Sequence, residues 1–273
     1  MRNTKKKYIV YFTLILILGV LVLTKFGKNR GSSADNFIQK TKVFYINLDK
    51  NVERRTTLMQ SYHTSDINLM PITRFSAIAG RDVNLEQWLT PKAITQLNNT
   101  ELTKTRTHHY QLTNGAVGCF LSHLTLAKQL LKDSDADYYI IFEDDLIFKH
   151  NTLSEIHNYL LDAPKDWDVI LLSSLRKIKY TEVGQFFKPE GFWGTQGYII
   201  NKKGANKLVK EVEKNKIDAQ IDAYMSRMIQ EYNLNLYITN KHLIDFTNSG
   251  SDIQMRVKVD PRNNPFIYKG YFV

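Results

Sequence analysis

The sequence predicts an α/β fold with a central parallel or mixed sheet, and two observations carry this prediction. Five consecutive apolar residues, Tyr138 to Phe142, are rich in aromatic and β-branched types. Such a run is typical of a strand buried on both faces, and strands of this kind occur in sheets flanked by helices. The preceding residues, 115–131, carry an apolar stripe at helical spacing that leads directly into the strand. A helix followed at once by a buried strand favours the α/β class.

The other elements follow from the same patterns, taken in chain order. Short apolar runs predict strands, apolar residues at helical spacing predict helices, and Gly80, Pro164 and Asn201 serve as stop or cap signals. We expect strands at 42–48, 71–78, 138–142, 167–174, 198–200, 234–238 and 242–244, and helices at 52–62, 91–97, 115–131, 154–161, 203–214 and 217–230. Residues 104–110 are expected to form a loop that exposes His108 and His109, because adjacent histidines cannot chelate from one face of a regular element.

Three adjacent carboxylates, Glu143, Asp144 and Asp145, follow the central strand. Their mutual repulsion is costly, and a hard divalent cation with oxygen ligands compensates it most directly. The carboxyl end of a strand in an open α/β sheet is also a common ligand site. The alternative is a solvated turn. The apolar residues 146–148 favour the first interpretation, because they make the acids a short interruption within buried structure.

Other candidate side chains keep both a functional and a structural interpretation. Arg54 and Arg55 lie in the first turn of a helix, where they suit a diphosphate or nucleotide but could equally be solvated. His123, on the flank of the apolar helix, is either a buried hydrogen-bonded histidine or a donor to substrate. Cys119 is expected to be a small core residue rather than a nucleophile.

A pair of acids and a pair of glycines complete the set of candidates. Asp218 and Asp222 are four residues apart, which on a helix places them on one face, where like charges mildly destabilise it. Either one of them serves a function or the face is simply exposed. Gly194 and Gly197 would allow the backbone to approach a ligand closely.

The distribution of charge argues against a nucleic-acid-binding protein. The net charge is +10, but residues 1–30 hold seven of the 37 Lys and Arg and no acid, which leaves 30 basic against 27 acidic groups in the rest. Residues 31–273 are therefore nearly balanced in charge, and they contain no basic stripe interleaved with aromatic residues of the kind that binds nucleic acid.

The uncharged run within residues 8–24, flanked by lysines, predicts a membrane-spanning signal anchor. A cleaved signal peptide is the alternative, but no small-residue cleavage site follows. We expect a cytoplasmic tail (1–7), the anchor (8–24), a stalk (25–40) and one folded domain (41–273), in a single-pass type II arrangement. The membrane would be that of the Golgi or endoplasmic reticulum in a eukaryote, or the inner membrane in a bacterium.

Five stretches together resemble glycosyltransferase family 25, the group of lipo-oligosaccharide and collagen galactosyltransferases: 44–49 with 53–55, 75–78, 115–123, 142–145 and 194–200. The resemblance implies a GT-A-like nucleotide-binding sandwich. It also implies transfer of a hexose, galactose or glucose, from a UDP-sugar to a hydroxyl of a glycan, glycoprotein or glycolipid, with inversion at the anomeric carbon.

The resemblance also implies roles for named residues. A Mn²⁺ or Mg²⁺ ion would stabilise the leaving diphosphate, with Asp145 as its direct ligand. Further metal ligands would be Glu143 and His242. The general base would be Asp222, with Asp218 as the second choice. The nucleotide or sugar donor would be bound by Asn47, Arg54, Arg55, Glu143, Asp144 and His123. The rival hypotheses are an inactive, membrane-anchored binding or adhesion protein of the same fold, and a metal-dependent nuclease.

Overall fold

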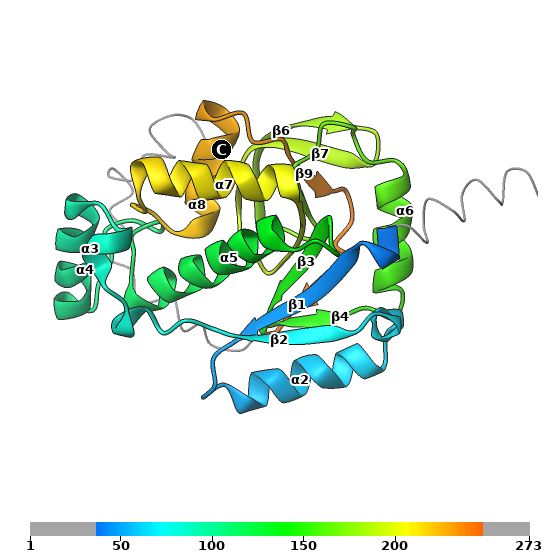
Figure 1. Ribbon diagram of the computed structural model, residues 1–273, viewed down its shortest axis with the longest axis horizontal. Helices are drawn as coiled ribbons and strands as arrows, with labels where there is room; N and C mark the ends of the chain where they lie inside the picture. The colour runs from blue at the N-terminus through cyan, green and yellow to red at the C-terminus, as the bar shows by residue number, and fades with distance from the viewer. Residues whose placement is uncertain (1–36, 248–273) are drawn as a thin grey trace, which may run out of the picture. The chain divides into compact units, whose positions relative to one another are not determined.

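The structure is a computed structural model that describes residues 37–247 (Figure 1). The chain divides into two compact units, residues 1–40 and 41–273, and the elements below belong to the second. The expected anchor over residues 8–24 lies outside the described residues. Among the helices that are described, none has the length and apolar character needed to cross a membrane.

Within residues 37–247, eight strands form one mixed sheet in the order β2-β1-β3-β8-β5-β9-β7-β6. The pairs β1–β2, β1–β3 and β5–β9 are parallel, and the remaining pairs are antiparallel. The expected mixed sheet is therefore confirmed. The bounds, in sheet order, are Ile72–Ser76, Thr41–Asn47, Tyr138–Glu143, Gly197–Asn201, Val169–Leu171, Leu236–Thr239, Phe186–Trp193 and Arg176–Val183.

Strand register brings three carboxyl ends to one edge of the sheet. In the parallel ladders, Asn47 at the end of β1 pairs with Ser76 of β2, and Ile46 pairs with Glu143 at the end of β3. Polar side chains that are far apart in sequence therefore meet at this edge, as expected for an open α/β sheet.

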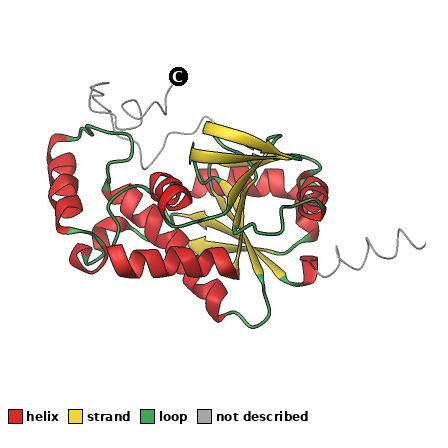
Figure 2. Ribbon diagram, turned by 90° about the horizontal axis from the view of Figure 1, so that it is seen from above, coloured by secondary structure: helices red, strands yellow, loops and turns green. Residues whose placement is uncertain are grey.

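Both faces of the sheet are covered by helices (Figures 1 and 2). Alternate strand residues such as Phe44 and Ile141 join one core with α5 (Asn114–Lys132), α7 (Lys202–Asn215) and α8 (Ile221–Glu231). The opposite set packs toward α6 (Thr152–Leu161) through the ring contact Tyr159–Phe186. It also packs toward α2 (Val52–His63) by way of Phe148, which contacts both Phe142 and Tyr62. The period-2 alternation of a strand thus supplies apolar side chains to two layers.

Helix α5 is fixed against the turn η2 (Gly80–Asp82) by an approach of backbone to backbone. A Cβ atom on Gly118 would lie 2.1 Å from the carbonyl oxygen of Ile78, and one on Gly80 would lie 1.9 Å from that of Asn114. Ser122 Oγ also accepts a hydrogen bond from the Ile78 N–H, at 2.9 Å. Only glycine permits this contact, which holds the face of α5 that carries Cys119 beside the sheet edge.

Several element predictions need correction. The hairpin β6–β7 was not expected, because β6 is lysine-rich and mostly exposed and so lacks an apolar pattern. The last helix begins at Ile221 rather than residue 217, so Asp218 and Asp222 do not share a helix face. Residues 81–113 contain α3 (Leu85–Trp88) and α4 (Pro91–Thr103). A separate antiparallel pair joins β4 (Leu146–Phe148) to β10 (Ile244–Phe246).

Candidate active site

The three carboxylates lie in a short connection between β3 and β4 that is held by the backbone on both sides. Glu143 N–H donates to the Gln196 carbonyl at 2.8 Å, and Thr247 N–H donates to the Asp145 carbonyl at 2.9 Å. Asp144 is 7% exposed. The acids therefore interrupt ordered, largely buried structure, and the alternative of a solvated turn is wrong.

Their side chains point to different partners. Asp144 accepts hydrogen bonds from Asn47 Nδ2 at 2.6 Å and Arg54 Nη1 at 3.0 Å. Glu143 accepts from Thr195 Oγ1 at 2.7 Å and lies 3.4 Å from His123 Nε2. Asp144 and Glu143 are thus compensated by protein groups.

Asp145 differs from its neighbours because its Oδ1 is buried and has no hydrogen-bond partner among residues 37–247. Burial, with the nearby charge of Glu143, raises the pKa of Asp145 to about 7. A buried carboxylate oxygen without a donor is costly unless it is protonated or binds a cation. The oxygen donors at this point, Asp145 Oδ1 and Glu143, fit a hard divalent ion such as Mn²⁺ or Mg²⁺.

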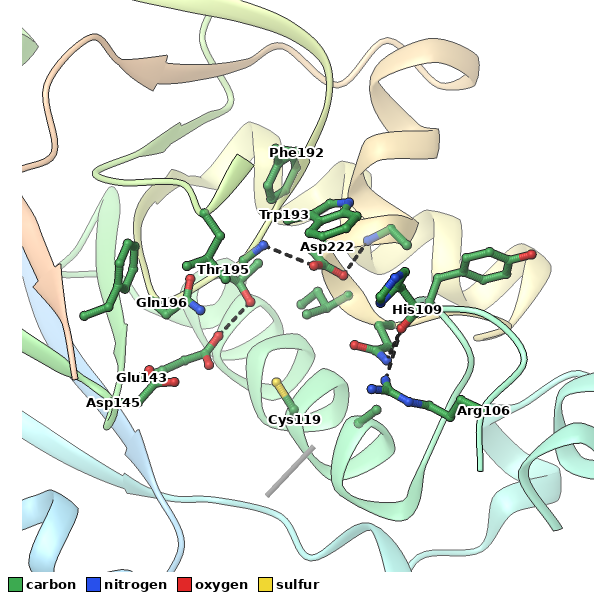
Figure 3. Close-up of a pocket in the computed structure, with 18 of the residues that line it drawn as sticks. Arg106, His109, Cys119, Glu143, Asp145, Phe192, Trp193, Thr195, Gln196 and Asp222 are labelled. Carbon is green, nitrogen blue, oxygen red and sulfur yellow. Dashed lines mark hydrogen bonds between the residues drawn. The ribbon is translucent and has the colours of Figure 1, made fainter. Parts of the chain in front are cut away.

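The described residues line two cavities that meet at the acids. The first, of about 470 Å³, is bounded by Arg54, residues 77–82 and the start of α5. The second, of about 400 Å³, is bounded by residues 192–196 and 220–223 and by Arg106 and His109 (Figure 3). Both are lined by Glu143, Asp145 and Cys119. The same three residues therefore face both cavities.

Asp222 lies in the second cavity, in the first turn of α8 (Figure 3). Its carboxylate accepts hydrogen bonds from Gly194 N–H at 3.1 Å and Ala223 N–H at 2.7 Å. Burial raises its pKa, although these backbone donors lower it in part. Gly194 has a φ of +91°, a conformation that glycine adopts without strain, and this turn directs the Gly194 N–H at Asp222.

The second cavity also contains residues that the sequence analysis missed. Arg106 is 3% exposed and donates from Nη1 to the His109 carbonyl at 3.1 Å, while its Nε has no partner within the described residues. Gln196 Oε1 is buried and likewise without a partner there. The ring centroid of Trp193 lies 5.2 Å from that of His109. No periodic signal marks Arg106, because it lies in a polar loop between helices.

The structure brings together part of the predicted site. Arg54, Glu143, Asp144 and Asp145 line the first cavity, and Glu143, Asp145 and Asp222 line the second. Gly194 lines the second cavity as well, but Gly197 does not. A Cβ on Gly197 would instead meet the side chains of Ile244 and Phe142.

Other predicted residues lie elsewhere. Asp218 forms a bidentate ion pair with Arg227, at 2.8 Å for both contacts, and does not line the cavity of Asp222. His242 Nδ1 is paired with Ser173 Oγ, and His242 lines neither cavity. Arg55 lines neither cavity.

Asn47 and His123 are supporting residues rather than cavity-lining ones. Asn47 is 1% exposed and bonds Asp144, the Asn51 carbonyl and Arg74 Nε, a residue on β2 that the sequence analysis did not consider. His123 is fully buried, and its Nδ1 lies 2.9 Å from the Tyr198 hydroxyl. His123 is thus a buried, hydrogen-bonded residue that lines neither cavity. Cys119 lines both cavities instead of lying wholly in the core.

Comparisons with known proteins bear on the family of the chain. The sequence model of "Glycosyltransferase family 25 (LPS biosynthesis protein)" matches residues 40–225. Procollagen galactosyltransferase 2 of Homo sapiens is 28% identical over 180 residues, which cover 62% of this chain and 27% of that protein. A glycosyltransferase 25 family member of Anopheles gambiae is 25% identical over 199 residues, covering 70% and 32%. The chain thus spans about a quarter to a third of the length of these curated relatives.

Two further matches complete the comparison. The inactive glycosyltransferase 25 family member 3 of Mus musculus is 27% identical over 180 residues, covering 62% of this chain and 28% of that protein. Among solved structures, a glycosyltransferase involved in glycosylation of the major capsid of PBCV-1 matches with a TM-score of 0.39 and 8% identity, over 77% of this chain and 94% of that one. The family match covers both the acid triplet and Asp222, and the chain belongs to glycosyltransferase family 25.

Proposed function

We propose that this chain is a metal-dependent, inverting hexosyltransferase that moves galactose or glucose from a UDP-sugar to a hydroxyl group of a glycan, glycoprotein or glycolipid. One observation carries the proposal: Glu143 and Asp145 line both cavities, and Asp222 lies in the second one. Galactose is favoured by the names of relatives such as procollagen galactosyltransferase 2.

The first cavity suits the nucleotide diphosphate of the donor. Arg54, Lys50 and Arg81 line it, as do Asn114 and Gly115 at the start of the 19-residue helix α5. Cationic side chains and the amino end of a helix both favour a diphosphate. A volume of about 470 Å³ lies within the range usual for small-molecule sites.

Asp145 and Glu143 would hold the metal ion, since they offer the oxygen donors at the junction of the cavities. The bound ion would supply Lewis-acid neutralisation of the charge that develops on the diphosphate. Asp144, already paired with Arg54 and Asn47, would hold Arg54 in place beside the nucleotide. His242 has no role in this proposal.

Asp222 would act as the general base. An acceptor alcohol is a poor nucleophile at neutral pH, so a carboxylate must take its proton as it attacks. Burial raises the pKa of Asp222, which makes its carboxylate a stronger base than an exposed aspartate. Inversion requires attack on the sugar from the side opposite the leaving group, and a base in the second cavity with the nucleotide in the first suits this requirement.

The lining of the second cavity suits a polyhydroxylated acceptor. Trp193 and His109 offer aromatic surface on which a sugar ring can pack (Figure 3). Arg106 Nε and Gln196 Oε1, which lack partners within the described residues, offer a donor and an acceptor to sugar hydroxyls. Buried polar groups in a binding site are satisfied by the ligand when the protein does not satisfy them.

An inactive binding protein of the same fold is the second candidate, since one relative carries the word inactive in its name. The buried Oδ1 of Asp145, which has no hydrogen-bond partner within the described residues, argues against an inactive protein. Such an oxygen destabilises the fold unless it binds a cation or a proton.

The test is release of UDP by the purified full-length chain in mild detergent, with a panel of UDP-sugars, with and without Mn²⁺. We expect release with one hexose donor, dependence on the metal, and loss of at least about 100-fold in Asp145→Ala, as for removal of a strong electrostatic contribution. Absence of release with every donor, or release unaffected by metal and by the substitution, would reject the proposal. Metal-dependent cleavage of oligonucleotides would point to the nuclease.

A further inference from the structure

A group of nitrogen, sulfur and oxygen donors lies where the two cavities meet, and two of its members, Cys119 and His123, have no role in the proposed transfer. Cys119 Sγ, His123 Nε2 and a Glu143 carboxylate oxygen lie within 4.8 Å of one another. Cys119 and His123 are four residues apart on α5 and therefore share a helix face, and Glu143 ends the neighbouring strand β3. We propose that Cys119, His123 and Glu143 form a binding site for a thiophilic divalent ion of the Zn²⁺ class, distinct from the hard-ion ligand Asp145.

The histidine is arranged as a metal ligand. His123 is fully buried, and its Nε2 makes no hydrogen bond within the described part of the chain although it faces Glu143 Oε1 at 3.4 Å. Its other nitrogen, Nδ1, is held by the Tyr198 hydroxyl at 2.9 Å. When Nδ1–H donates to that oxygen, the lone pair of Nε2 points at the cluster. A fixed outer partner of this kind is the usual support of a metal-bound histidine.

Glu143 has equivalent support, because Thr195 Oγ1 donates to its Oε1 at 2.7 Å. Zn²⁺ binds sulfur and nitrogen at about 2.0–2.3 Å, so its ligand atoms lie roughly 3.3–3.8 Å apart. The separation of His123 from Glu143 already falls in this range. A movement of about 1 Å by the thiol of Cys119 would complete the site.

The composition of the site selects the ion. A thiolate with an imidazole favours Zn²⁺ and similar ions, whereas Mg²⁺ and Mn²⁺ prefer oxygen ligands. Cys119 lines both cavities, which gives an ion a path to the site. Three protein ligands leave the fourth position of a tetrahedral ion open. The ion would engage Glu143 and add positive charge beside Asp145, so it would act as an inhibitor of the transferase. The inhibition rests on the proposed function, whereas binding of the ion by Cys119, His123 and Glu143 does not.

The test uses Co²⁺ as a spectroscopic substitute for Zn²⁺, with the full-length chain purified in mild detergent without a histidine tag. Cys119 is the only cysteine in the sequence, so a thiolate-to-cobalt charge-transfer band can arise only from it. We expect one equivalent of Co²⁺ to produce the band and Zn²⁺ to remove it. Absence of the band, or a band that Zn²⁺ does not remove, would overturn the proposal.

Two variants and a control define the ligands. Cys119→Ser should abolish the band and weaken Zn²⁺ binding, measured against a chromophoric chelator, by about 100-fold or more, because changes of outer-shell groups alone cost roughly 10–100-fold. His123→Gln should weaken it to a similar extent. His157→Gln, which removes a histidine of α6 outside the cluster, should leave it unchanged.

A measurement on the unaltered chain guards against variants that fail to fold. Zn²⁺ should protect the Cys119 thiol from a thiol-specific reagent, and a chelator should restore its reactivity. Equal reactivity with and without Zn²⁺, or equal Zn²⁺ affinity in folded Cys119→Ser, would show that the cluster is not the binding site.

Discussion

Asp222 combines two properties that a general base for an alcohol needs. It lies in a cavity with space for an acceptor, and two backbone N–H groups hold its carboxylate in one orientation. We therefore expect Asp222→Asn to lower kcat by about 10²- to 10⁴-fold, the usual contribution of general-base catalysis. The KM for the donor should change little, because the nucleotide cavity is untouched. Steady-state kinetics of UDP release in the presence of acceptor measure both constants.

Asp218→Asn is the matched control for that substitution. Asp218 pairs with Arg227 and lies outside the cavity, so we expect kcat to stay within about twofold. The pair is partly exposed, and its loss should lower the free energy of unfolding by at most about 1 kcal/mol. A large fall in kcat for Asp218→Asn with a normal rate for Asp222→Asn would exchange their roles.

The raised pKa of Asp222 predicts the acid limb of the pH profile. Burial raises this pKa above that of an ordinary aspartate, and only the deprotonated form can accept a proton. The rate should therefore fall as pH drops through the raised value, at a higher pH than an exposed aspartate would give. The measurement is kcat against pH at saturating donor, acceptor and metal. A rate that stays constant down to the pKa range of exposed aspartates would contradict the assignment.

At the scale of secondary-structure elements, the contact of α5 with the segment before it sets the position of Cys119 and His123. Gly118→Ala would force a Cβ to 2.1 Å from the Ile78 carbonyl oxygen, and backbone cannot yield as a side chain can. We expect a loss of about 1–3 kcal/mol in the free energy of unfolding, the usual cost of overpacking. Urea denaturation followed by circular dichroism measures this loss.

Gly191→Ala is the control for the glycine substitution. A Cβ on Gly191 in β7 would meet Ile178 and Ser226 at ordinary contact distances of 3.5 Å. Its free energy of unfolding should change by no more than about 0.5–1 kcal/mol, the cost or gain typical of such a change in a strand. Equal losses in the two variants would show that the approach of α5 to residues 78–80 is not a tight one.

The turn between α5 and β3 is held by Asp133. Its carboxylate accepts hydrogen bonds from Lys42 Nζ, at 2.7 and 2.9 Å, and from the Tyr139 hydroxyl at 2.7 Å. Burial acts to raise the pKa of Asp133, but these donors outweigh it and lower that pKa well below its usual range. The contribution to stability is therefore complete above the unfolded-state pKa of about 3.9 and is lost as pH falls toward the folded-state value.

Asp133→Asn should accordingly lower the free energy of unfolding by about 1–2 kcal/mol at neutral pH, an estimate reduced for the exposure of Lys42. The difference from the unaltered chain should shrink as the pH falls below about 3.9. Denaturation curves at both pH values measure it. A difference that grows in acid would mean that the aspartate is not stabilised in its charged form.

Among the elements, those with a strong apolar pattern were predicted and those without one were not. The buried strand β3 and the amphipathic helix α5 lie where the pattern placed them. The lysine-rich strand β6 forms because it pairs with β7, and no local signal reports that pairing. The segment before α8 looks helical in sequence, but Ile217 pairs with Leu89 and Gln220 N–H donates to the Tyr110 carbonyl, so tertiary contacts keep residues 217–220 out of the helix.

At the scale of the whole molecule, the membrane anchor remains a prediction. Residues 8–24 lie outside the described residues, and the uncharged run flanked by lysines still favours a span with the folded domain across the membrane. We expect the full-length chain to sediment with membranes and to resist an alkaline wash. A chain that lacks residues 1–36 should appear in the supernatant. Release of the full-length chain by alkali would contradict an integral anchor.

The sequence by itself determined the fold class, the position of the acid triplet and the family, because apolar periodicity and short contiguous motifs are local properties of the chain. It also pointed to Asp222 as a candidate, although the argument from a shared helix face was wrong. Only the tertiary structure separated the roles of the three adjacent acids. Two of these acids have different partners, which come from β1, α2, α5 and the loop before β8. The same holds for Arg106 and for the cluster at Cys119, since their neighbours are distant in sequence and meet only when the sheet and α5 are packed.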